Sequence, residues 1–306
     1  MKNFKNNREL LLLALPAIII TILVKYLAYP GLILAFKDYQ SSSTQGFFGS
    51  LISSPWVGLE NFKFLAINPD IGLVLRNTLG YNILLIVLGL VAAVASAIIL
   101  NEILNLKTKK YIQTMMFFPF FMSWVSVSYM MIGFFDTDFG FINQVITFFG
   151  GTPVEWYNDP TWWPFIIIFM GLWKGLGYNS VIYLSSVMSI DKSFYEAAII
   201  DGASKWQQIK WITIPTLKPM MIILTILGIG GIMYSDFGLF YQLPRNSAAL
   251  YNVTQTLDIF VYNAIQAPGS LELSAAAAFF QSIIGCTMVI GTNFIVRKLD
   301  PDSSLF

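Results

Sequence analysis

The chain has 306 residues, of which 56% are apolar and 11% charged, whereas a soluble domain has roughly 25% charged residues. Its formal net charge of +1 excludes the strongly basic surface that nucleic-acid binding requires. It has no histidine, and its one cysteine, Cys286, cannot form an internal disulfide. We therefore expect no metal, no cofactor in this chain and no nucleic-acid partner.

Six apolar segments are long enough to cross a bilayer core, which takes about 20 helical residues. They cover residues 10–36, 71–100, 111–134, 162–188, 220–240 and 273–296. The first follows Lys2, Lys5 and Arg8 as a signal peptide would, but it continues past Lys25 without a small-residue cleavage site. The pattern predicts an all-α membrane protein with six transmembrane helices in a single domain over residues 1–306.

Most of the 18 Lys and Arg residues lie on one side of these spans. That side carries Lys2, Lys5, Arg8, Lys107, Lys109, Lys110, Lys192, Lys205, Lys210, Lys218, Arg297 and Lys298. Because cytoplasmic loops are enriched in Lys and Arg, we expect both termini and the segment 193–219 to be cytoplasmic.

The segment 193–219 is a polar, turn-rich interruption between the fourth and fifth spans. Ser193 and Glu196 have the spacing of a capping box, which predicts that a short helix begins at Ser193. Gly202 follows this helix, and a glycine there permits a turn or a very close approach of another backbone segment.

A second short helix is predicted directly after this turn. Ser204 and Gln207 repeat the capping spacing, and Pro215 is expected to end the helix. The two helices would expose Ile199 and Trp206 as a compact docking surface.

The spacing of this segment resembles a known motif. Glu196-Ala197-Ala198, three residues, Gly202, nine residues and then Ile212-Thr213-Ile214-Pro215 resembles the EAA loop of permease subunits of ATP-binding-cassette (ABC) importers; Ile214 stands where that family more often has Leu. The resemblance implies a cytoplasmic coupling helix that sits in a cleft of an ATPase subunit. The residues it assigns to ATPase coupling are Glu196, Ala197, Ala198, Asp201, Gly202, Ala203, Trp206, Ile212 and Pro215.

Three further stretches, at residues 54–62, 76–78 and 256–262, resemble the maltose-type carbohydrate permeases, in particular the oligosaccharide and polysaccharide branch. This resemblance implies a type I importer fold, a second and different permease subunit, an extracellular solute-binding lipoprotein, and a bacterial cytoplasmic-membrane location. No G-x-x-x-x-G-K-[ST] sequence is present, so we expect ATP to be hydrolysed by two partner subunits that bind Mg-ATP.

Polar side chains within the spans are candidates for the substrate pathway. A lysine within a span is costly unless it faces water, pairs with an acid or extends its ammonium to the membrane surface, so Lys174 is a candidate. Asp236 is the acid that the sequence places deepest in an apolar run. The full set is Trp124, Ser128, Tyr129, Lys174, Asn179, Tyr183, Tyr234 and Asp236. Gly228, Gly230 and Gly231 predict close approach of another helix.

Other functions remain open on the residues alone. An ion-coupled secondary transporter or channel predicts inverted repeats and several intramembrane acids, of which only Asp236 is found. A membrane-embedded transferase would need a catalytic cluster on one face, and none emerges. The loop 136–160 holds Asp136, Asp138, Glu155 and Asp159; a glycosidase needs two rigidly spaced carboxyl groups, so a solvated loop or a contact with an external protein is favoured.

Overall fold

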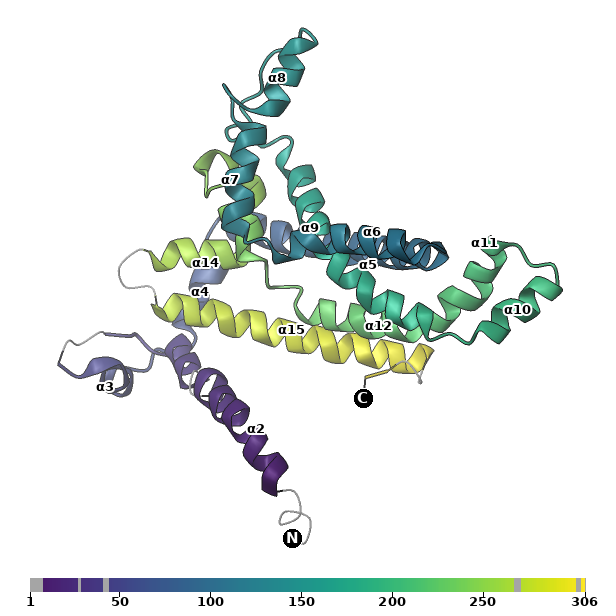
Figure 1. The fold of residues 1–306 in the computed structure, drawn as a ribbon. Coiled ribbons are helices and arrows are strands. Elements are labelled where there is room, and N and C mark those ends of the chain that lie inside the picture. The colour runs from purple at the N-terminus through teal and green to yellow at the C-terminus, as the bar shows by residue number, and fades with distance from the viewer. Residues whose placement is uncertain (1–7, 27–28, 41–43, 267–270, 301–303, 306) are drawn as a thin grey trace. The chain divides into compact units, whose positions relative to one another are not determined.

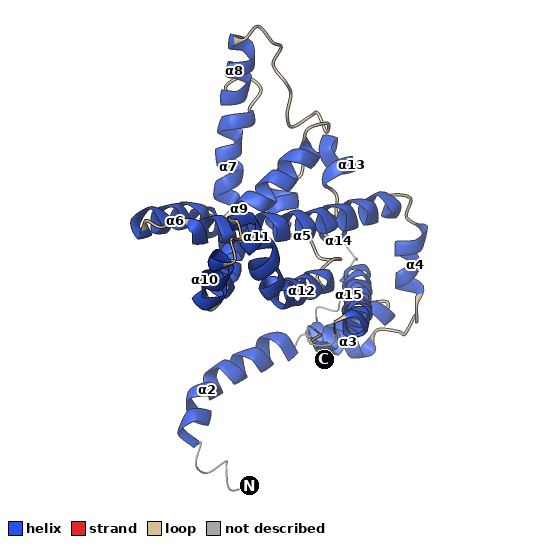
Figure 2. Cartoon of the chain, turned by 90° about the vertical axis from the view of Figure 1, so that its right-hand side faces the viewer, coloured by secondary structure: helices blue, strands red, loops and turns tan. Residues whose placement is uncertain are grey.

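The computed structural model describes residues 8–26, 29–40, 44–266, 271–300 and 304–305; Lys2 and Lys5 of the orientation argument lie outside these ranges. Within them the chain forms helices and loops, with one isolated bridge between Lys37 and Trp56 (Figures 1 and 2). In chain order the elements are α2 (Arg8–Thr21), η1 (Ile22–Tyr26), η2 (Tyr29–Phe36), α3 (Gly46–Ser53), α4 (Glu60–Ile67), α5 (Ile71–Glu102), α6 (Leu106–Phe121), α7 (Trp124–Phe135), α8 (Phe141–Phe148), α9 (Trp163–Met188), α10 (Lys192–Ile200), α11 (Lys205–Gln208), η3 (Ile209–Thr213), α12 (Ile214–Gly230), η4 (Gly238–Gln242), η5 (Ala248–Leu250), α13 (Tyr251–Thr254), α14 (Leu257–Ile265) and α15 (Leu271–Leu299). They form two compact units, residues 1–71 with 261–282 and residues 72–260 with 283–306.

Four of the predicted spans coincide with helical segments that are long and apolar enough to cross a membrane. These segments are Leu12–Phe36, which includes residues 27–28 outside the described ranges, Ile71–Glu102, Trp163–Met188 and Leu271–Lys298. The third and fifth predicted spans differ from the structure.

The predicted fifth span, 220–240, is wrong at its end, because the helix stops at Gly230. The helix runs from Lys205 through α11, η3 and α12 to Gly230. Beyond Gly230 the backbone leaves the helix, and Asn82 of α5 donates its amide N–H groups to the carbonyl oxygens of Ile232 at 2.8 Å and Tyr234 at 3.0 Å. These bonds satisfy backbone acceptors that have lost helical partners.

The predicted third span, 111–134, is not one continuous helix. α6 and α7 meet at an angle of 101°, with only Met122 and Ser123 between them. Pro119 supplies no N–H to the last turn of α6, and the Ser123 hydroxyl accepts the N–H of Ser126 at 3.1 Å as N-cap of α7. As a result, α7 and α8 extend away from α6, while α7 packs beside the first half of α9 (Figure 1).

The helices of the larger unit pack through small and apolar residues. α6 lies along α9, and a methyl group added at Gly177 would come within 2.6 Å of the Phe117 Cα, so only glycine fits at this crossing. A buried cluster joins α5, α9 and α12 and contains Ala93, Val94, Ala97, Leu100, Tyr183, Leu184, Val187 and Leu217. Burial of these side chains fixes the relative positions of the three helices.

Glycine also permits the contact between α12 and α15. A methyl group at Gly230 would lie 2.6 Å from the Val289 Cγ2, and one at Gly285 would lie 2.6 Å from the Gly230 carbonyl oxygen. The prediction that Gly230 allows a neighbouring helix to approach closely is confirmed.

A buried lysine organises the smaller unit. Lys37 is 5% exposed, and its ammonium donates to the carbonyl oxygens of Leu51 at 2.7 Å and Ile52 at 3.1 Å at the end of α3. Asn61 of α4 donates to the carbonyl oxygens of Ala35 at 3.1 Å and Lys37 at 2.9 Å. These bonds tie η2, α3 and α4 together.

Candidate functional site

The first helix of the predicted docking surface begins earlier than expected. The prediction of a Ser193–Glu196 capping box is wrong, because the N-cap is Asp191, whose carboxylate accepts the Ser193 N–H at 2.9 Å. This hydrogen bond from the Ser193 backbone holds the pKa of Asp191 below its usual range. α10 therefore starts at Lys192 and has an ionised cap at neutral pH.

The turn between the two short helices is the one predicted. Gly202 has φ of +77°, its N–H donates to the Ile199 carbonyl at 3.0 Å, and the Ala203 N–H donates to the Ala198 carbonyl at 2.8 Å. This pair of bonds is a Schellman motif, in which glycine takes the left-handed position without steric cost.

The second helix starts with the predicted capping box. The Ser204 N–H donates to Gln207 Oε1 at 2.7 Å, and the Gln207 N–H donates to Ser204 Oγ at 3.4 Å. The prediction that Pro215 ends this helix is wrong. In the π-helical turn η3 the Ile214 N–H donates to the Ile209 carbonyl. Pro215 lies in the first turn of α12, where the N–H that proline lacks would have no helical acceptor in any case.

The α10–α11 pair presents a large apolar surface and is anchored to the helices behind it. Tyr195 and Thr213 share a hydrogen bond of 2.9 Å, and Lys205 pairs with Glu102 of α5 at 3.0 Å. The large exposed side chains of the pair are Phe194, Ile199, Ile200 and Trp206, and Trp211 is exposed on the following turn, η3. Of the nine predicted coupling residues, Glu196, Ala197, Asp201, Gly202, Trp206 and Pro215 are exposed, and Ala198, Ala203 and Ile212 are half-buried.

A cavity of about 300 Å³ lies between α5, α9 and the α6–α7 break. Lys174 reaches from α9 to three carbonyl oxygens at the break, those of Pro119 at 3.3 Å, Phe120 at 3.0 Å and Met122 at 2.6 Å. These carbonyls lie at the negative end of α6, where a cation is stabilised by the helix dipole.

Trp124, the first residue of α7, forms the other polar contact of this cavity. Its indole N–H donates to Asp236 Oδ2 at 2.8 Å, while Asp236 Oδ1 accepts the N–H groups of Gly238 at 2.8 Å and Leu239 at 3.3 Å. Asp236 is exposed rather than buried, which corrects the sequence interpretation. Its carboxylate caps η4 and holds α7.

A second cavity, of about 320 Å³, adjoins the first and shares Leu85, Gly89 and Asn179 with it. Its polar lining comes from Asn82, Asn179, Tyr183 and Thr225. Amide and hydroxyl groups on an otherwise apolar wall are typical of sites that bind uncharged polar ligands.

A family model described as "Binding-protein-dependent transport system inner membrane component" matches residues 85–304. The chain belongs to this family. Protein LplB of Bacillus subtilis (strain 168) is 32% identical over 302 residues, which is 99% of this chain and 92% of LplB. The "Polygalacturonan/rhamnogalacturonan transport system permease protein YteP" of the same organism is 33% identical over 292 residues, covering 95% and 88% of the two chains.

A solved permease has the same fold. A chain from the "crystal structure of a bacterial ABC transporter involved in the import of the acidic polysaccharide alginate" superposes with a TM-score of 0.85 at 26% identity, covering 98% of each chain. The predicted all-α fold class and type I ABC importer permease fold are confirmed, and the chain is a multi-pass inner membrane protein. The cytoplasmic placement of the termini stays a prediction.

The cavities of this permease bring together five of the eight predicted pathway residues: Trp124, Lys174, Asn179, Tyr183 and Asp236. The other three do not line them. Ser128 is buried and donates to the Val125 carbonyl at 2.8 Å, Tyr129 is exposed on α7, and Tyr234 contributes its carbonyl to Asn82.

Sequence reasoning missed Asn82, Thr225 and Phe120 as lining residues. Asn82 and Thr225 are polar positions within apolar helices, a signal that was available in the sequence. Phe120 carried no signal, because it is one of several phenylalanines around Pro119 and its place depends on the break.

In the acidic loop 136–160, the carboxylates of Asp136, Glu155 and Asp159 accept hydrogen bonds from groups close by in the chain. Asp136 accepts the N–H groups of Asp138 and Phe139, both at 2.9 Å, and Glu155 accepts the Asn158 amide at 3.0 Å. Hydrogen bonds from Thr161 lower the pKa of Asp159. The arrangement favours the solvated-loop interpretation over a pair of catalytic acids.

Proposed function

We propose that this chain is the permease subunit of an ATP-driven importer that carries a carbohydrate, either an oligosaccharide or a polysaccharide fragment, across the cytoplasmic membrane by alternating access. The observation that carries the proposal is the exposed apolar α10–α11 pair, which continues without interruption into α12. The family and the printed cargoes of its relatives, namely polygalacturonan and rhamnogalacturonan for YteP and lactose for LacF of Rhizobium radiobacter, support it.

The continuous helix explains how force would reach the cavity. α11, η3 and α12 run from Lys205 to Gly230, and Thr225 and Gly228 on the same helix line the second cavity. A displacement of the α10–α11 pair by an ATPase would therefore move one wall of the cavity. ATP drives transport only if it favours one access state through contacts that the pair makes better in that state.

The proposal implies several partners. A different permease subunit completes the pathway, two ATP-binding-cassette subunits bind Mg-ATP and hydrolyse it, and an extracellular solute-binding lipoprotein delivers the carbohydrate. The alginate transporter, whose chain has a TM-score of 0.84 at 26% identity, was solved "in complex with alginate pentasaccharide-bound periplasmic protein", which supports the last of these. Both termini and the α10–α11 pair face the cytoplasm.

The cavity lining suits a sugar. Asn179 and Tyr183 offer hydrogen-bonding groups, and Trp124 and Phe120 offer aromatic faces on which a sugar ring can stack. Asn179 borders both cavities, so it is placed to contact a chain of several sugar units.

Substitution of the coupling surface tests the proposal. Trp206→Ala removes a side chain that is 70% exposed, and Glu196→Lys reverses an exposed charge. Both variants are expected to lose the co-purifying ATPase in mild detergent and to lose transport. Trp162→Ala, which removes an exposed tryptophan at the opposite end of α9, is the matched control and is expected to keep both. Transport that persists without any ATPase would refute the proposal.

Orientation is tested separately by labelling. Ile200 is 86% exposed on α10, so an Ile200→Cys substitution in a Cys286→Ser background gives a single accessible thiol. A membrane-impermeant maleimide is expected to label it only after the membrane is opened. Labelling of intact cells would place the α10–α11 pair outside and contradict the ATPase contact.

A further inference from the structure

The 101° break between α6 and α7 leaves backbone carbonyl groups without helical partners. The last carbonyls of any α-helix lack N–H donors, and here the chain turns sharply after Phe121 instead of continuing. Within a membrane protein such acceptors need donors from the protein, because lipid provides none. The start of α7 is capped locally by Ser123, whereas within the described part of the chain the end of α6 has no comparable local cap apart from the Met122 N–H, which donates to the Pro119 carbonyl at 3.1 Å.

Lys174 supplies the missing donors. Its ammonium group has three N–H bonds, and its three hydrogen bonds to the carbonyls of Pro119, Phe120 and Met122 use all of them. The ammonium nitrogen also lies 5.3 Å from the centre of the Trp124 ring and 6.0 Å from that of Phe120, which is a favourable cation–π arrangement.

The direction in which α7 leaves the break is held from its other side. Trp124 is bonded to Asp236, and its ring lies so close to Gly238 that a methyl group there would come 2.5 Å from the Trp124 Cβ. Trp124 is thus confined between the Lys174 ammonium and the backbone of η4.

We propose that Lys174 is a positioning residue of the pathway: it holds the break in the third span open at its observed angle and so directs Trp124 and Phe120 at the cavity. With every N–H committed to a carbonyl, Lys174 is not the cation that recognises an acidic group on the cargo. Its effect on transport is exerted through the aromatic wall. The effect of Lys174 on transport rests on the proposed function, whereas its role in the geometry of the break does not.

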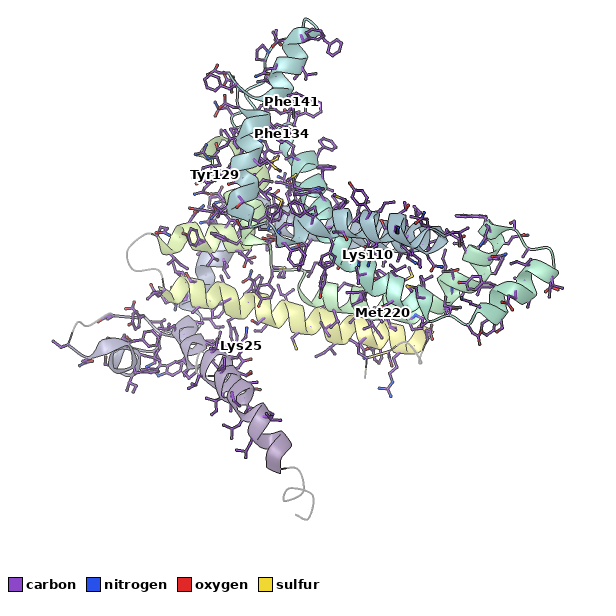
Figure 3. The ribbon with its side chains drawn as sticks, in the orientation of Figure 1. Lys25, Lys110, Tyr129, Phe134, Phe141 and Met220 are labelled. Carbon is purple, nitrogen blue, oxygen red and sulfur yellow. The ribbon has the colours of Figure 1, made fainter. Side chains whose placement is uncertain are left out.

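The distance between two spin labels, one on each side of the break, tests the proposal without a transport assay. Lys110 on α6 and Tyr129 on α7 lie on the two arms of the break (Figure 3) and both are exposed. Spin labels on Lys110→Cys and Tyr129→Cys, in a Cys286→Ser background and in the full assembly, are expected to give a single narrow distance distribution. Lys174→Met, which keeps the length and loses every donor, is expected to broaden and shift it. Lys174→Arg keeps the charge and the donors and is expected to retain the narrow distribution.

The control is Lys298→Met, since Lys298 also lies over an aromatic ring, at 4.6 Å from Phe294, but sits at the end of α15. An unchanged distribution in Lys174→Met, or equal broadening in Lys298→Met, overturns the proposal. If Lys174→Met does not assemble, Lys174→Leu, which also loses every N–H donor, is judged by the same criterion. Because the readout is a distance, a negative result leaves the proposed import function standing.

Discussion

Gly177 offers a test of how α6 and α9 pack, because a single methyl group should disturb the crossing. In Gly177→Ala the new Cβ would lie 2.5 Å from the Met116 carbonyl carbon and 2.6 Å from the Phe117 Cα. Both neighbours are backbone atoms, so no side-chain rotation relieves the contact. Carbon atoms need about 3.5–4.0 Å, so the two helices must separate by roughly 1 Å.

The free energy of unfolding of Gly177→Ala should be lower than that of the wild type because overpacking typically costs about 1–3 kcal/mol. This loss is reduced by about 0.5–1 kcal/mol because alanine is a better helix former than glycine. Gly175→Ala is the matched control on the same helix, since its Cβ would lie 3.5 Å from the Asn179 Nδ2, an ordinary contact. Thermal unfolding in detergent is expected to rank Gly175→Ala at or above the wild type and Gly177→Ala below it. Equal melting temperatures for the two variants would refute the packing argument.

Three further predictions concern segments outside the membrane spans. Gly202→Ala forces a side chain into φ of +77° with open space around it, so a cost of about 1–2 kcal/mol arises from the backbone alone, and binding of the ATPase should weaken without loss of the folded bundle, as measured by co-purification. The lowered pKa of Asp191 means that its cap is complete above the ordinary aspartate pKa of about 4 and is lost as pH falls toward the lowered value. After division by the intrinsic exchange rate at each pH, the protection of the α10 amides against hydrogen exchange should fall on acidification, and Asp191→Asn should abolish that fall. Burial, the largest cause, raises the pKa of Tyr157 to about 12, so stability present below pH 10 should decline between pH 10 and about 12, and Tyr157→Phe should remove this alkaline loss in a thermal melt.

Local patterns predicted much of the backbone structure of residues 193–219 because its determinants are close in sequence. The Ser204–Gln207 box and the Gly202 turn each depend on bonds within five residues. The start of α10 was misplaced because Asp191 and Ser193 are both good N-caps, and local spacing does not decide between them. The prediction that Pro215 ends the helix failed for a different reason. The π-helical turn before Pro215 lets the helix continue through a proline that is usually taken as a helix end.

The break in the third span could not be predicted from hydropathy. The run 111–134 contains no charged residue, and Pro119 alone is compatible with a gentle kink. What fixes the 101° angle comes from elsewhere in the chain: the Lys174 ammonium from α9 and the Asp236 carboxylate beside η4. Side chains separated by tens of residues leave no periodic signature in the segment whose shape they determine.

Lys174 and Asp236 also show why the rule that intramembrane charges are functional was only partly informative. The rule identified both residues, but it assigned them to the cargo because it considers each charge without its backbone neighbours. In the structure each charge neutralises a helix end, Lys174 at the carboxyl end of α6 and Asp236 at the amino end of η4, and Trp124 contacts both. A cavity whose charges are already engaged in this way offers the cargo mainly aromatic faces, amides and hydroxyls. Discrimination among carbohydrates by this wall should therefore depend on ring shape and hydroxyl pattern more than on cargo charge.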